Sequence, residues 1–125
     1  MKNNDKFEIV FYEDKNGKSD IYDFIENLRL KSLKSKDARI QYRQVSLYIE
    51  LLANNGSILS SDIMKKLSGD IWELRPGHNR VLYFFCKDNK YVLLHHFVKK
   101  TQKTPKKEID RAIKEMNDYI ERMVK

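Results

Sequence analysis

Residues 71–105 read IWELRPGHNRVLYFFCKDNKYVLLHHFVKKTQKTP, and this stretch decides the fold. It contains three runs rich in β-branched and aromatic residues, at 71–75, 80–86 and 91–98, separated by Pro-Gly-His-Asn and Lys-Asp-Asn-Lys. Turn-forming residues between such runs are typical of β-hairpins. The stretch is therefore predicted to form a three-stranded antiparallel meander.

Four-residue loops at both turns set a register for this meander. The predicted cross-strand pairs are Trp72–Tyr83, Glu73–Leu82, Arg75–Arg80, Leu82–His95 and Phe85–Val92. Side chains alternate between the two faces of a sheet, so one face becomes almost wholly apolar and is expected to be the core. Its members are Trp72, Leu74, Val81, Tyr83, Phe85, Val92 and Leu94. A slip of one residue would exchange the two faces.

The other face gathers polar side chains at the turn end of the sheet. Glu73, Arg75, Arg80 and His95 are expected there, on a half-open surface among Leu82, Phe84, Leu93 and Phe97. Two arginines directly opposite each other repel unless an anion lies between them. This face is therefore predicted to bind an anionic group.

The rest of the chain supplies one further strand and three helices. A strand is predicted at 7–12, a helix capped by Ser19 or Asp20, a second helix from about Ser35 to Ala53, and a third opened by Thr104-Pro105. Residues 63–67 are predicted to be short and irregular. The order β-α-α-β-β-β-α gives an α+β fold, a single domain over residues 1–125, with helices packed against one sheet face.

The charge balance points to a polyanionic partner. The 25 Lys and Arg against 18 Asp and Glu give a net charge of +7, which suits nucleic acid, an acidic protein or an anionic membrane. Six basic residues between Arg29 and Arg43 form either a solvated helix face or an outer contact for a nucleic-acid backbone. A single cysteine, Cys86, lies in an apolar run and is predicted to be a buried thiol. The absence of an apolar leader or an 18-residue apolar run predicts a cytoplasmic protein.

Four segments are similar to the HigB-type branch of the RelE superfamily of toxins. They are KLSGDIWELR at 66–75, RVLY at 80–83, LLH at 93–95, and KKTQKTP at 99–105 with Glu108, Ile109 and Ala112 behind it. The resemblance implies a RelE-like fold and a ribosome-dependent mRNA endoribonuclease, the toxin of a type II toxin–antitoxin pair. It implies a HigA-like helix-turn-helix antitoxin as partner, in a heterotetramer. The ribosome and mRNA are the other partners, and operator DNA is bound only through the antitoxin.

The residues themselves suit RNA cleavage without a metal or another cofactor. That reaction deprotonates a ribose 2′-OH, protonates the leaving 5′-oxygen and stabilises charge on phosphorus. Arg75 and Arg80 are predicted to bind phosphate oxygens. His95 is the candidate acid or base, and Glu73 either orients a guanidinium or acts as base. Lys99 and Lys100 are placed to reach the reacting group.

A second set of basic residues is predicted to bind flanking parts of the RNA. Its members are Lys103, Lys106, Lys107, His78, Arg39 and Arg43. No metal site is expected, because His95 and His96 point to opposite sheet faces and one cysteine offers no zinc-binding spacing. By the same alternation, His96 is expected on the helix-covered face.

Each site residue also has a purely structural interpretation. Arg75 and Glu73 would form a cross-strand or surface ion pair, and His95 would be a half-buried sheet histidine. The alternative function is accordingly a catalytically inactive RelE-fold module that only binds its antitoxin or RNA. A DNA-binding protein is a weaker alternative, since no helix concentrates the Arg, Asn and Gln of a major-groove reader.

Overall fold

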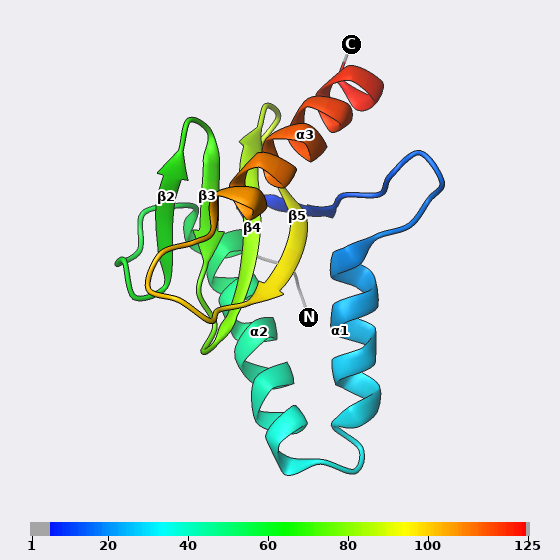
Figure 1. The fold of residues 1–125 in the computed structure, drawn as a ribbon, viewed down its shortest axis with the longest axis vertical. Coiled ribbons are helices and arrows are strands. Elements are labelled where there is room, and N and C mark those ends of the chain that lie inside the picture. The colour runs from blue at the N-terminus through cyan, green and yellow to red at the C-terminus, as the bar shows by residue number, and fades with distance from the viewer. Residues whose placement is uncertain (1–5, 125) are drawn as a thin grey trace.

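The computed structural model describes residues 6–124 as three helices and a five-stranded sheet (Figure 1). The elements are β1 (Glu8–Phe11), α1 (Asp20–Lys31), α2 (Lys36–Asn55), β2 (Met64–Ser68), β3 (Ile71–Leu74), β4 (Asn79–Cys86), β5 (Lys90–Val98) and α3 (Lys106–Met123). The predicted α+β class and element order are confirmed. One element was missed: residues 63–67, predicted to be irregular, contribute most of strand β2.

The sheet has the strand order β1-β5-β4-β3-β2. Strand β1 pairs in parallel with β5, while the other neighbours are antiparallel. The sheet is therefore mixed, rather than antiparallel as predicted. Strand β2 forms because Met64 is buried while Lys65 and Lys66 stay exposed, which lets a mostly polar segment serve as an edge strand.

Helices cover both faces of the sheet, and the prediction of one covered face is wrong. Helix α3 crosses the sheet on one side and α2 runs behind it on the other (Figure 1). One buried cluster joins Leu82, Phe84 and Leu94 to Ala112 of α3; another joins Tyr83 and other residues of the opposite face to the first two helices. Because both faces of the central strands are apolar, each needs its own helical layer.

The first two helices begin where the sequence indicates. The Ser19 hydroxyl accepts a hydrogen bond from the Tyr22 amide at 3.1 Å, and Ser35 does the same for the Ala38 amide at 3.1 Å. Such caps satisfy amides that the first helical turn leaves unpaired. At the other end of α2, Gly56 takes a φ of 70°, a conformation that glycine adopts without strain.

The predicted register holds in the first hairpin and fails partway along the second. Trp72 pairs with Tyr83, Glu73 with Leu82, and Leu82 with His95, as predicted. Beyond Leu82 a β-bulge inserts one extra residue in β5, so that Phe85 pairs with Tyr91 instead of Val92. This shift by one residue places Val92 and Leu94 under α3, and Leu93 on the face of α1 and α2.

Two predictions from composition can be compared with the structure. The thiol of Cys86 is buried and unpaired, as its apolar run indicated. None of the helices within residues 6–124 combines the length and apolar character needed to cross a bilayer.

Candidate functional site

A small polar pocket opens at the turn end of the sheet, on the face that α3 partly covers. It lies between β3, β4 and the connection from β5 to α3, which passes beside β3 in Figure 1. We call it the arginine pocket; it is lined by Glu73, Arg75, Arg80, Phe97, Lys99, Lys100, Thr101, Gln102, Lys103, Thr104 and Pro105. Of the six residues predicted as catalytic, five line this pocket and His95 does not. Lys103, which was predicted to bind RNA, lines it as well.

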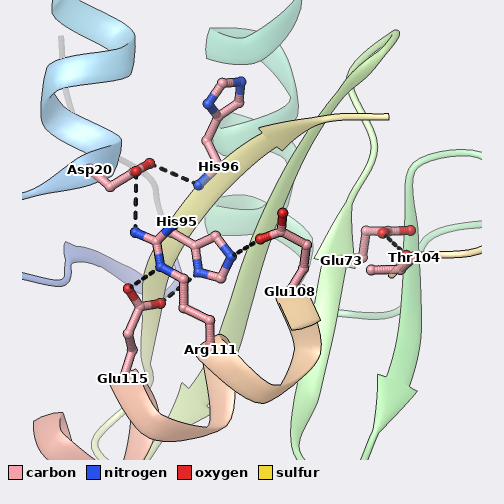
Figure 2. A network of polar contacts seen from close by, with 8 residues as sticks. All are labelled: Asp20, Glu73, His95, His96, Thr104, Glu108, Arg111 and Glu115. Carbon is pink, nitrogen blue, oxygen red and sulfur yellow. Dashed lines mark hydrogen bonds and ion pairs between the residues drawn. The ribbon is translucent and has the colours of Figure 1, made fainter. Parts of the chain in front are cut away.

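A buried carboxylate holds the pocket together. Glu73 is only 2% exposed, and its Oε2 lies 3.4 Å from Arg75 Nε and 3.8 Å from Arg80 Nε. Its other oxygen accepts a hydrogen bond from the Thr104 hydroxyl (Figure 2). A carboxylate so deep in the protein is tolerated because cations and a hydroxyl surround it. Glu73 therefore orients both guanidiniums and ties the connection before α3 to the sheet.

Backbone carbonyls fix one end of each guanidinium. Nη1 of Arg80 donates to the carbonyls of Gly77 at 2.7 Å and Asn79 at 2.9 Å. Nη1 of Arg75 donates to the carbonyl of Ser61 at 2.7 Å. Burial lowers the pKa of Arg80, and the nearby carboxylate of Glu73 opposes this effect. The guanidinium remains charged, because arginine does not lose its proton in proteins.

The second terminal nitrogen of each guanidinium remains available. Nη2 of Arg75 and Nη2 of Arg80 take part in none of the hydrogen bonds formed within residues 6–124. Across the same residues no buried side-chain nitrogen or oxygen lacks a partner, so both Nη2 atoms must reach solvent. The two arginines are thus fixed in place and still have donors to offer an incoming anion.

Lysines form the outer wall of the pocket. Lys99 is held at its backbone, where its amide donates to the His78 carbonyl at 2.8 Å. Lys100 and Lys103 are exposed. Five cationic side chains thus line the pocket against one carboxylate, and the unbalanced positive charge attracts an anion such as phosphate. No group of three or more His, Cys, Asp or Glu within 6–124 is arranged to hold a metal ion.

His95 lies elsewhere, in a buried arrangement that we call the histidine clamp: His95, Glu108 and Glu115. The imidazole is 0% exposed beneath α3, so the half-open surface predicted for it is wrong. Its Nε2 is 3.0 Å from Glu108 Oε1, and its Nδ1 is 2.6 Å from Glu115 Oε1 (Figure 2). Helix α3 covers this position, which sequence alternation on the strand could not show.

The histidine clamp ties α3 to the sheet. Each nitrogen of the imidazole lies within hydrogen-bond distance of a carboxylate oxygen from α3. Arg111 extends the network, donating to Glu115 at 3.1 Å and to Asp20 at 3.3 Å. Every hydrogen-bonding atom of the buried ring is satisfied, so the clamp is a structural fastening between α3, β5 and the start of α1.

His96 faces the opposite layer, as predicted. Its ring stacks on Phe24 of α1, with ring centroids 3.5 Å apart, and its backbone amide donates to Asp20 at 2.9 Å (Figure 2). Burial lowers the pKa of the His96 imidazole. The ring is therefore neutral near pH 7.

The remaining predicted RNA-binding residues do not line the pocket. His78 is exposed in the turn before β4, joined to the pocket only through its backbone carbonyl. Lys106 forms an ion pair with Asp110 at 2.7 Å, and Lys107 is exposed beside it in the first turn of α3. Arg39 and Arg43 are exposed on α2, in the opposite layer.

Three residues that matter to this region, Thr104, Glu108 and Glu115, were not among the predicted site residues. Glu108 and Glu115 are seven positions apart and thus lie on one side of a helix, a spacing that marks them as a pair facing a common partner. Thr104 gave no such signal, because nothing in the sequence places the residue before Pro105 against Glu73.

Comparison with known proteins places the chain in a family. A model for the family described as Phage derived protein Gp49-like matches residues 30–117. The match begins near the end of α1, includes every residue of the arginine pocket and the histidine clamp, and ends within α3. No curated protein shows significant similarity to the chain. Because the match covers well over half of its length, the chain belongs to the Gp49-like family of phage-derived proteins, a RelE-type, toxin-like family.

Proposed function

We propose that this protein is the toxin of a type II toxin–antitoxin pair and cleaves mRNA on the ribosome without a metal ion. The observation that carries the proposal is the arginine pocket, where two immobilised guanidiniums share one buried carboxylate beneath a wall of lysines. Membership of a toxin-like family supports the biological role.

The pocket suits the phosphate at which RNA is cut. In the proposed reaction the ribose 2′-oxygen attacks the adjacent phosphorus and the bond to the 5′-oxygen breaks, leaving a 2′,3′-cyclic phosphate and a 5′-hydroxyl. Extra negative charge develops on the phosphoryl oxygens between these events. The Nη2 groups of Arg75 and Arg80 are positioned donors for that charge, and such donors act without reorganising during the reaction.

Proton transfer falls to groups at the rim of the pocket. The ammonium of Lys99 or Lys100 supplies the proton to the 5′-oxygen. The proton of the 2′-OH passes to the second of these lysines, once that lysine is deprotonated. Glu73 is engaged by two arginines and Thr104, so we assign it a positioning role. His95 is sealed in the histidine clamp, and we assign it the same kind of role, through α3.

The remaining basic residues extend the contact with RNA. Lys103 continues the lysine wall of the pocket, while Lys107 is exposed in the first turn of α3. We propose that they bind phosphates on either side of the cleaved bond, with Arg39 and Arg43 meeting ribosomal RNA. A HigA-like helix-turn-helix antitoxin, joined in a heterotetramer, would neutralise the toxin and carry it to operator DNA.

One observation favours the alternative, an inactive RelE-fold module that binds antitoxin or RNA only. The histidine expected to serve as acid or base has no access to solvent, so proton transfer depends wholly on rim groups. Binding to RNA phosphates would survive without such transfer.

Induced expression in a bacterial host separates the two functions. The toxin is expected to arrest growth and to create new mRNA 5′ ends within reading frames. Cleavage in a single-turnover assay on preformed ribosome–mRNA complexes is expected to persist when free divalent ions are chelated after assembly. Normal growth with soluble, folded protein would refute the toxin and leave the binding module.

A further inference from the structure

A second and larger concavity lies on the other face of the sheet, between α1 and α2. We call it the acidic groove; it has a volume of about 570 Å³, within the range of ligand-binding sites. One side of α1, along its whole length from Asp20 to Lys31, and the start of α2 form its walls, and Asn79, His96 and Val98 form its floor. Neither the arginine pocket nor the histidine clamp opens into it.

The charge of this groove is opposite to that of the chain. Three aspartates, Asp20, Asp23 and Asp37, line it against one lysine, Lys31, in a protein of net charge +7. Asp20 is already committed, since it accepts from Arg111 and from the His96 amide. Asp23 and Asp37 are exposed and have carboxylate oxygens to offer. A smaller pocket beside it shares Asp20 and Asp23 and adds Asp14 and Glu115, alongside Lys18 and Arg111.

A chain of hydrogen bonds across the floor fixes which atoms donate and which accept. The Gln41 amide donates to Asp37 at 2.7 Å, so its oxygen faces Asn79, whose amide donates to it at 3.0 Å. The Asn79 oxygen then faces His96 Nε2 at 3.1 Å, so this nitrogen carries the proton. Since the ring is neutral, Nδ1 is an acceptor. His96 Nδ1 has no hydrogen-bond partner within residues 6–124. Because no buried side-chain nitrogen or oxygen among these residues lacks a partner, this atom must reach solvent.

The groove therefore offers hydrogen-bond acceptors beside an apolar stretch of its α1 wall. The acceptors are the carboxylates of Asp23 and Asp37 and the imidazole of His96, while Phe24 and Leu28 supply apolar surface. A matching ligand needs cationic donors on apolar stems. Arginine and lysine side chains have this composition, and a guanidinium also stacks on aromatic rings such as Phe24.

We propose that the acidic groove binds an arginine- or lysine-bearing segment of a partner protein. RNA is disfavoured because its phosphates would meet the carboxylates. The groove extends across two helices and continues into the neighbouring acidic pocket, which suits an extended peptide better than a single free amine. A partner seated here leaves the arginine pocket uncovered, since the two lie on opposite sheet faces.

The test uses the ¹⁵N-labelled full chain titrated with the peptide acetyl-Arg-Leu-Arg-Leu-Arg-amide, followed by amide chemical shifts. We expect saturable shifts at groove residues, and binding weakened by about tenfold or more in the double variant Asp23→Asn/Asp37→Asn. The matched control is Glu50→Gln/Glu121→Gln, which removes two exposed carboxylates outside the groove and should bind like the wild type. Each variant's amide spectrum verifies its fold.

Several results would overturn the proposal. Shifts that do not saturate, or an equal loss in the control variant, would mean that net charge alone attracts the peptide. A peptide with citrulline in place of each arginine keeps the shape of the side chains without their charge. If it binds as tightly as the arginine peptide, recognition by charge is refuted. If spermine shifts the same amides and binds as tightly as the peptide, the ligand is a free polyamine. If a short RNA does so, the groove is an RNA site.

Discussion

The arginine pocket and the histidine clamp lie on the same face of the same sheet, and each pairs buried nitrogen-bearing side chains with carboxylates. In the pocket one carboxylate serves two arginines among three further cations, so donors remain unused. In the clamp two carboxylates serve one imidazole, and no ring nitrogen is left over. This difference shows what identifies a candidate binding site: charged side chains whose donors are not all paired and which solvent can reach. The presence of a typically catalytic residue such as histidine is a weaker sign.

If this contrast is right, the largest effect on stability comes from the clamp. His95→Ala removes the imidazole between Glu108 and Glu115, which deprives Glu108 of this partner and leaves Glu115 with Arg111. We expect the free energy of unfolding to fall by about 2–4 kcal/mol, measured by denaturant titration. His78→Ala, an exposed histidine in a turn, is the control and should change it by less than about 0.5 kcal/mol.

A double-mutant cycle sharpens this first prediction. The effects of His95→Ala and Glu115→Ala should fall short of additivity by more than about 0.5 kcal/mol, because the two side chains form one network. Additive effects would mean that the 2.6 Å contact contributes nothing to stability.

The next effect, on the cleavage rate, concerns how the lysine-bearing connection between β5 and α3 is held against the sheet. Thr104→Val keeps the side-chain shape and removes the hydroxyl that donates to Glu73. The connection before α3 loses its fixed position over the arginines, so the single-turnover cleavage rate should fall about tenfold with little change in stability. Thr101→Val is the control, since that hydroxyl donates only to the nearby carbonyl of Lys103 at 2.7 Å. An equal fall in both variants would contradict a special role for Thr104.

A smaller effect is expected at the rim. Lys103→Ala should weaken RNA binding modestly and reduce the slope of log affinity against log salt concentration by about 0.7, the loss of one phosphate contact. Lys114→Ala, an exposed lysine on α3 outside the pocket, should leave that slope unchanged. Filter binding of single-stranded RNA at several salt concentrations measures both. An unchanged slope for Lys103→Ala would remove this lysine from the interface.

The smallest effect is a pH dependence that arises at His96. Burial lowers the pKa of this imidazole in the folded state, with Asp20 and Glu108 opposing the shift and His95 adding to it. The unfolded chain therefore binds more protons as the pH falls below about 6.5. Stability from this residue is complete above that pH and is lost as the solution becomes more acidic. His96→Asn should flatten the wild-type decline between pH 7 and 5 in denaturant titrations; an unchanged slope would contradict the assignment.

Much of this architecture follows from local sequence rules. Ser19 and Ser35 mark their helices, and the turn around Gly77 fixes the pairs of the first hairpin. That register already brings Glu73, Arg75 and Arg80 to one end of one face, and the lysines follow directly from the last strand. These relations depend on residues close together in the chain, which is why they can be predicted.

The rest depends on contacts between distant segments. The extra residue at Leu94 shifts half of β5, and no local pattern announces it. The burial of His95 depends on where α3 lies, since Glu108 and Glu115 come from that helix. Strand β2 forms because β3 offers it an edge, although its own sequence is mostly polar. In each case tertiary packing overrides local preference.

The most direct test of the central claim compares Arg80→Ala with His95→Asn in single-turnover cleavage on preformed ribosome complexes. Both proteins are assayed at a temperature where circular dichroism shows them folded. We expect Arg80→Ala to lower the rate by about 10²- to 10³-fold, because a fixed donor to the phosphoryl group is gone, and His95→Asn to lower it by less than about tenfold. Full activity without Arg80 together with complete loss in His95→Asn would contradict the account and place the chemistry at the clamp.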